Sequence, residues 1–263
     1  MNPFFFGSSD RPLYGVHHQG AVPVADIGVV LCYPLGSEYL RAHRAFRQLT
    51  NLLVRTGIHV LRFDYLGTGD SGGDPNDATI EQWTEDVNSA ITELKDSTGL
   101  QRVSLAGLRL GATLAARAAF PRSDVDRIVL WDPVADGGSW FDRLIRDERN
   151  QREDEAETPL PFPAGTVGIG GFPVTPALSE GIHTLSLGTM APGEEMEVDL
   201  IVSKEDPAVE RLVEDWRAGN DRAGRVRYRC IPSEGDWAKG DRFGSALIPQ
   251  SIIQGVIECL RRN

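Results

Sequence analysis

Residues 103–115 constrain the fold more than any other part of this chain. They begin as a short apolar strand, pass Gly107 and Gly111, and continue as a helix of small residues. Glycine is needed at such positions because the helix and the neighbouring strands approach too closely for a side chain. The pattern therefore predicts a sharp strand-to-helix turn that lifts the side chain of Arg109 above a sheet.

Strands and helices alternate along the rest of the chain. Apolar runs predict strands at 27–32, 59–63, 102–106, 127–131, 197–203 and 225–231, after an antiparallel hairpin around 13–17. Three- and four-residue apolar spacing predicts helices at 41–56, 80–94, 110–120, 207–218 and 245–261, with a capping box at 79–82. This alternation predicts an α/β fold, a mostly parallel twisted sheet with helices on both faces.

Length, charge and cysteine content limit the choice of partners. A chain of 263 residues suits one α/β domain with an insertion. The formal net charge, 27 − 38 = −11, disfavours nucleic acid and anionic membranes as partners. No apolar run approaches the roughly 20 residues that span a bilayer, and the apolar start lacks the basic segment of a signal peptide. The three cysteines lack metal-type spacing and predict reduced core residues in a cytoplasmic protein.

Four segments together resemble the α/β-hydrolase superfamily, in particular its serine-aminopeptidase-like and exosortase-associated hydrolase-like branch. They are residues 4–7 (FFFG), 33–38 (YPLGSE), 64–72 (DYLGTGDSG) and the turn around Arg109. The resemblance implies an α/β-hydrolase core formed by residues 1–136 and 196–263. It also implies that residues 137–195 are a lid over the pocket, with a solvated loop as the alternative.

In this superfamily the turn carries the nucleophile, and an acid and a histidine follow along the chain. The resemblance places the acid at Asp206, with Asp132 as a second possible place, and the histidine at Asp236. The five histidines are at positions 17, 18, 43, 59 and 183, so no histidine lies beyond residue 183. Arg109 stands where the nucleophile is expected. Nucleophile and base are both missing, which predicts that the chain does not use a Ser-His-Asp triad.

Arg109 can serve neither as nucleophile nor as base, because its guanidinium stays protonated and has no acceptor lone pair. Beside the oxyanion-hole amides that the resemblance places at Leu35 and Leu110, it would hold developing negative charge on a substrate. Asp206, Asp236 or Glu38 would then move protons. The alternative is a structural ion pair in which one of these three carboxylates neutralises Arg109.

Other candidate pocket residues are Ser37 and Tyr39, beside Leu35, and Trp237, beside Asp236. The leading hypothesis is an enzyme that acts on a small acyl- or carbonyl-containing metabolite by cyclisation, elimination or water addition, with no metal or organic cofactor. One alternative is a non-catalytic binding or scaffold protein. The other is an ester or thioester hydrolase with an unconventional nucleophile, Ser37 or Ser71. A homodimer is possible, and the expected ligand is a small-molecule substrate.

Overall fold

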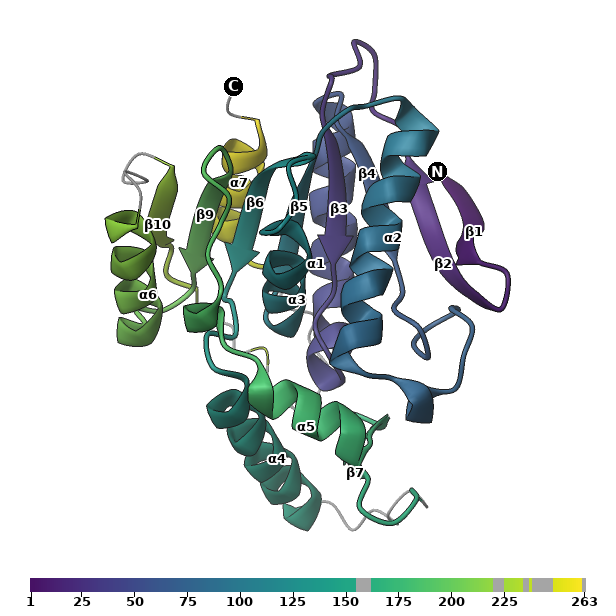
Figure 1. Ribbon diagram of the computed structural model, residues 1–263, viewed down its shortest axis with the longest axis vertical. Helices are drawn as coiled ribbons and strands as arrows, with labels where there is room; N and C mark the ends of the chain where they lie inside the picture. Colours follow the sequence, from purple (N-terminus) through teal and green to yellow (C-terminus); the bar gives the residue numbers. More distant parts are fainter. Residues whose placement is uncertain (155–161, 220–224, 234–236, 238–247, 262–263) are drawn as a thin grey trace.

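The computed structural model describes residues 1–154, 162–219, 225–233, 237 and 248–261. Its central element is an eight-stranded sheet (Figure 1). The strands are β1 (Asn2–Ser8), β2 (Arg11–His18), β3 (Gly28–Cys32), β4 (His59–Phe63), β5 (Val103–Leu108), β6 (Val125–Trp131), β9 (Glu197–Val202) and β10 (Val226–Cys230). Their order is β1-β2-β4-β3-β5-β6-β9-β10. The β1–β2 and β2–β4 pairings are antiparallel and the remaining pairings are parallel, which confirms the predicted sheet and its initial hairpin.

The middle of the sheet is completely covered. Every residue of β3 and of β5 is buried. When helices cover both faces of a parallel sheet, the sequences of its strands are continuous apolar runs instead of alternating patterns. The carboxyl ends of these parallel strands point toward α4 and α5, at the bottom of Figure 1.

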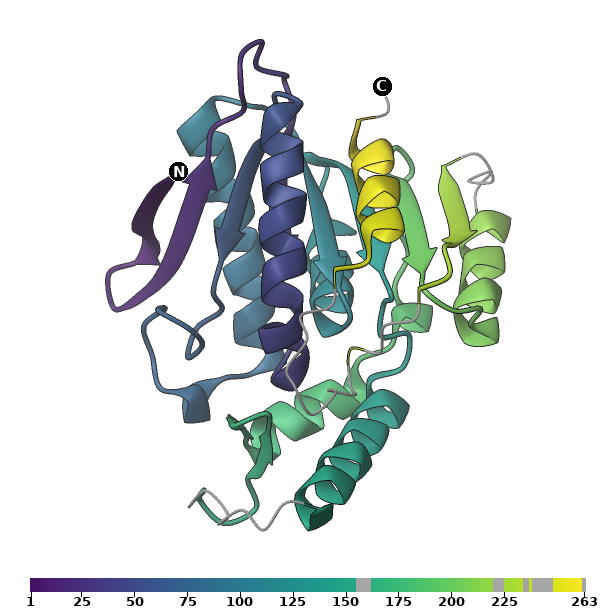
Figure 2. The same ribbon diagram turned by 180° about the vertical axis from the view of Figure 1, so that it is seen from behind.

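Helices cover both faces of the sheet, as predicted. They are α1 (Ser37–Arg55), α2 (Ile80–Thr98), α3 (Leu110–Ala119), α6 (Pro207–Ala218) and α7 (Gln250–Leu260). Helices α2, α3 and α6 lie in front of the sheet in Figure 1, and α1 and α7 lie in front in Figure 2. The Thr79 side chain accepts a hydrogen bond from the Gln82 amide and so caps α2, as the sequence predicts.

Helix α1 begins at Ser37, four residues before residue 41, so the predicted start was wrong. Gly36 has a φ of 60° and turns the chain directly into the helix. Glu38 and Tyr39 therefore lie in the first helical turn instead of in a loop. The predicted last helix spans 245–261, but Ile248 and Pro249 are not helical and the helix begins at Gln250, so the predicted start was too early. Residues 245–247 lie outside the described residues.

The segment expected to be a lid follows β6. It contains α4 (Gly137–Asp154), the short hairpin β7 (Val167–Ile169) and β8 (Phe172–Val174), α5 (Pro176–Thr184) and the 3-10 turn η2 (Leu187–Thr189). These elements lie below the carboxyl ends of the strands (Figure 1). Across the described residues, no helix is long and apolar enough to cross a membrane.

Candidate functional site

The turn between β5 and α3 has the sharp geometry that the sequence predicts. A Cβ added at Gly107 would lie 2.5 Å from the Gly111 carbonyl oxygen, and one at Gly111 would lie 2.2 Å from the Tyr33 carbonyl oxygen. Neither position can hold a side chain without moving backbone. Arg109, between them, has a φ of 56° and a ψ of −125°, a conformation that costs an L-residue energy.

The Arg109 side chain turns toward a carboxylate on α1. Its Nε donates to Glu38 Oε1 at 2.9 Å, and its Nη1 donates to the Asp132 carbonyl oxygen at 3.2 Å. The Arg109 side chain is 23% exposed, whereas that of Glu38 is 0% exposed. Of the three carboxylates proposed as partners of Arg109, Glu38 therefore forms a buried ion pair with it.

Glu38 is held in an environment that opposes its charge. Burial raises the pKa of its carboxyl, and the charge of Arg109 and its hydrogen bond work against that rise. Among the described residues, the second carboxylate oxygen, Oε2, is buried without a partner at hydrogen-bond distance, and the Trp140 side chain adds to the opposition to the pKa rise. The negative charge of Glu38 consequently depends on Arg109, because a buried carboxylate without a cation would favour its protonated form.

Asp132 follows β6 and has the second unusual backbone conformation of the site, with a φ of 42°. Both of its carboxylate oxygens accept hydrogen bonds, Oδ1 from the Ser203 amide at 2.6 Å and Oδ2 from the indole of Trp237 at 3.1 Å. The Trp237 ring is buried and packs edge-on against Trp131, with 5.3 Å between the ring centroids. Asp132 therefore links the ends of β6 and β9 to the side chain of Trp237.

Arg109, Asp132 and Trp237 line a polar pocket of about 180 Å³. Its other walls come from the segment after β9, which includes Lys204 and Asp206. Asp206 is exposed and caps α6, since its Oδ1 accepts a hydrogen bond from the Ala208 amide at 2.9 Å. Asp236, the residue at the expected histidine position, lies outside the described residues.

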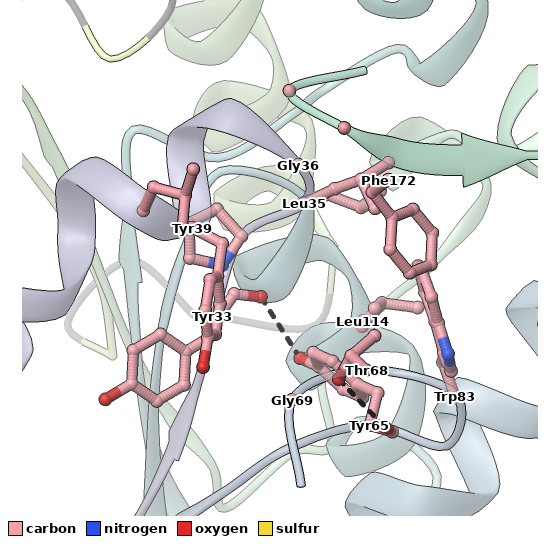
Figure 3. A pocket seen from close by; sticks show the side chains of 15 residues that line it. Tyr33, Leu35, Gly36, Tyr39, Tyr65, Thr68, Gly69, Trp83, Leu114 and Phe172 are labelled. Carbon is pink, nitrogen blue, oxygen red and sulfur yellow. Dashed lines mark hydrogen bonds between the residues drawn. The ribbon is translucent and has the colours of Figure 1, made fainter. Parts of the chain in front are cut away.

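The expected oxyanion amides belong to a different pocket. Leu35 and Leu110 line an apolar pocket of about 240 Å³ that Arg109 does not line. Leu110 is the first residue of α3, and the first amides of a helix have no acceptor within that helix. Figure 3 shows Tyr33 and Tyr39 on one side of this pocket and Trp83 and Phe172 on the other.

The tip of the β7–β8 hairpin forms part of the apolar pocket. Gly170, Gly171 and Phe172 line it, and a Cβ added at Gly170 would lie 2.4 Å from the amide nitrogen of Ser37. The hairpin tip therefore packs directly on the start of α1, and Ser37 lies beneath that contact.

Among the described residues, no histidine lies in either pocket of the site. All five histidines belong to the described part of the chain, and none lines the apolar or the polar pocket. His183, the last of them, lies on α5, where its ring bonds to the Ser179 carbonyl oxygen and to Asp142. The hydroxyl of Ser71 donates to the Asp64 carbonyl oxygen and accepts from the Tyr14 amide, so it braces a turn.

Several wall residues were not predicted from the sequence. Trp83 and Leu114 belong to apolar helix stripes, which predict core packing, and both also line the apolar pocket. Phe172 lies in the Gly- and Pro-rich part of the insertion, where no periodic pattern exists. Lys204 could have been predicted from its position shortly after the strand β9. Residues that follow the carboxyl ends of parallel strands gather at the ligand-binding edge of an open α/β sheet.

Residues 29–235 match the model of the alpha/beta hydrolase family, and the chain belongs to that family. The match covers all of β3 except Gly28, the turn at Arg109 and most of the polar pocket.

Individual relatives are similar over shorter stretches or only in fold. The human mitochondrial palmitoyl-protein thioesterase ABHD10 is 38% identical over 64 residues, which are 24% of this chain and 20% of that protein. The Pyrococcus furiosus esterase Pf2001 has a TM-score of 0.67 at 18% identity, covering 99% of this chain and 90% of that one. The proline iminopeptidase of Mycobacterium smegmatis has a TM-score of 0.64 at 16% identity, covering 98% and 97%. These structures show the shared fold.

Proposed function

We propose that this chain is an enzyme that acts on a small acyl- or carbonyl-containing metabolite by cyclisation, elimination or addition of water, without a serine nucleophile. The observation that carries the proposal is a pair of backbone conformations. Among the described residues, Arg109 and Asp132 are the two non-glycine residues with positive φ, and both line the polar pocket. Such conformations cost on the order of 1–3 kcal/mol each and cluster at functional sites.

Each polar group has a role in this proposal. Arg109 holds negative charge as it develops on the substrate, together with the amides of Leu35 and Leu110. Glu38 fixes the guanidinium in place through their ion pair. Asp206, which lines the polar pocket, carries protons between the substrate and water. The sequence makes Asp236 a second candidate for that role.

The apolar pocket would take the carbon skeleton of the substrate. Tyr39 and Phe172 give it aromatic walls. Leu110 also lines it, next in sequence to Arg109, which lines the polar pocket. Residues 137–195 would act as the lid, because the tip of the β7–β8 hairpin already forms one wall. Three free cysteines, of which Cys32 and Cys259 are buried, favour a cytoplasmic setting.

The competing function is that of a non-catalytic binding or scaffold protein. The complete burial of Glu38 favours it, because Arg109 would then be a structural ion pair in a fold that has lost its triad. The two functions differ in what the guanidinium does for a substrate.

Turnover by arginine variants tests the proposal. The protein would be incubated with a panel of acyl thioesters, esters and β-keto acids, and products would be followed by mass spectrometry. We expect at least one substrate to be converted, and Arg109→Ala to reduce its conversion about a hundredfold or more. Arg117→Ala is the matched control, since Arg117 lies on the same helix and pairs with Glu81 at the surface.

Two results would contradict the proposal. One is stoichiometric labelling of a serine by a fluorophosphonate probe, which would indicate a serine nucleophile. The other is full turnover by Arg109→Ala. If that variant does not fold, Arg109→Lys replaces it, because lysine keeps the charge and loses the planar fork of donors.

A further inference from the structure

Apart from the apolar and polar pockets, the molecule has a cleft of about 290 Å³ between α1 and the β2–β4 end of the sheet. We call it the second cleft. Val16 of β2 pairs with Arg62 of β4, so their side chains lie on the same face of the sheet. The start of α1 covers this face with Tyr39 and His43. Figure 2 shows α1 running in front of the sheet, next to the N-terminal hairpin. Arg109 does not line this cleft.

Arg62 brings a positive charge and unused hydrogen-bond donors into the cleft. A guanidinium has five N–H groups. Hydrogen bonds from Nε and Nη2 to His18 Nε2 and from Nη1 to the Tyr33 hydroxyl use three of them. Burial lowers the pKa of His18 to about 4, so this acceptor is neutral near pH 7. Within the described residues Arg62 has no carboxylate partner within 4.0 Å, so two N–H groups remain for a ligand. Its charge also acts on Asp64, where it works against the rise in pKa that burial causes.

Other groups in the cleft limit which anion fits. The His43 ring and the Tyr14 hydroxyl have no hydrogen-bond partner among the described residues, so both can donate. Asp64 is already engaged, since its two oxygens accept from the Tyr39 hydroxyl at 3.0 Å and from the Asp70 amide at 3.1 Å. Asp64 and Asp70 both line the cleft, and their carboxylates repel a multiply charged anion more strongly than a singly charged one.

We propose that this cleft is a binding site for an aromatic monocarboxylate. The planar carboxylate would accept the two remaining N–H groups of Arg62, a geometry for which a guanidinium is suited and an ammonium is not. The ring would lie along Tyr14 and Val16, which give the cleft an apolar wall. This ligand site is separate from the proposed reaction, although Tyr33 and Tyr39 line both the cleft and the apolar pocket.

Calorimetric titration with benzoate tests the proposal on the full chain. We expect one saturable binding event, weakened at least tenfold by Arg62→Gln and unchanged by Arg44→Gln. Arg44 is the matched control because it is an exposed arginine of α1 that does not line the cleft. Val16→Phe fills the cleft and leaves Arg62 in place, so it should also abolish binding. Inorganic phosphate should not compete with benzoate.

Several outcomes would overturn the site. They are the absence of saturable benzoate binding at millimolar concentration, equal affinity in Arg62→Gln and Arg44→Gln, and displacement of benzoate by phosphate. Loss of binding in Arg109→Lys with retention in Arg62→Gln would assign benzoate to the polar pocket instead. If Arg62→Gln does not give a folded circular dichroism spectrum, Val16→Phe decides between these results. None of these measurements depends on whether the chain is an enzyme.

Discussion

The apolar and polar pockets differ in chemistry although consecutive residues of one turn line them. Arg109 lines the polar pocket, and Leu110, the next residue, lines the apolar pocket. The sequence predicts a single corner in which the guanidinium lies beside the oxyanion amides. Instead, Glu38 and the Asp132 carbonyl oxygen hold the Arg109 side chain on the polar side. A substrate that uses both sets of donors must therefore extend across the turn, from the amides of Leu35 and Leu110 to the guanidinium of Arg109.

The largest expected effect is on the ion pair of the polar pocket. Arg109→Ala leaves the carboxylate of Glu38 buried without its cation, which typically costs about 3–5 kcal/mol of folding stability. The double variant with Glu38→Gln should regain most of that loss, because no charge is then left in the interior. Urea unfolding of both single variants, the double variant and the Arg117→Ala control measures the coupling. Additive losses in the double variant would show that the pair does not act as a unit.

A smaller effect is expected beside the apolar pocket, at a buried carboxylate that forms no ion pair with any described residue. Asp86 accepts hydrogen bonds from the Leu66 amide and from Gln82, and burial raises its pKa from 3.8 to about 6. The folded state thus holds this proton more tightly than the unfolded chain. The resulting stability is present below about pH 4 and is lost as the pH rises through about 6, by at most about 3 kcal/mol.

Asp86→Asn tests that prediction, because asparagine cannot lose a proton in this range. Its free energy of unfolding, measured from pH 4 to pH 7, should fall less with rising pH than that of the unaltered protein. Asp77→Asn is the control, since Asp77 is an exposed residue on the turn before α2. Parallel pH curves for the unaltered protein and Asp86→Asn would mean that Asp86 does not titrate differently on folding.

The smallest effect is expected at the wall between the apolar pocket and the second cleft. Tyr39→Phe removes the hydrogen bond from the tyrosine hydroxyl to Asp64 and leaves the ring contact with Tyr33. The expected loss is about 1 kcal/mol, the usual net value of one such bond or slightly more for a charged acceptor. Thermal unfolding measures it. A loss above about 3 kcal/mol would indicate that Asp64 depends on Tyr39 for its charge.

Local patterns were enough to predict most of the fold. The glycines around Arg109, the cap at Thr79 and the apolar runs of the strands act over a few residues, so their effects can be predicted from neighbouring positions. The start of α1 could not be predicted in this way. Gly36 usually signals a loop, and here its positive φ leads straight into a helix, which moved Glu38 onto the helix that faces Arg109.

The sequence by itself determined that this chain has an α/β-hydrolase fold, that Arg109 occupies the sharp turn, and that no histidine follows residue 183. It could not decide which of three carboxylates pairs with Arg109. Tertiary structure brought Glu38 to Arg109, because the two residues are 71 positions apart in the chain and meet only when α1 packs against the sheet. The same packing separated the apolar pocket from the polar one. Side-chain directions across such distances depend on how helices and strands fill space together, and periodicity in one segment does not specify them.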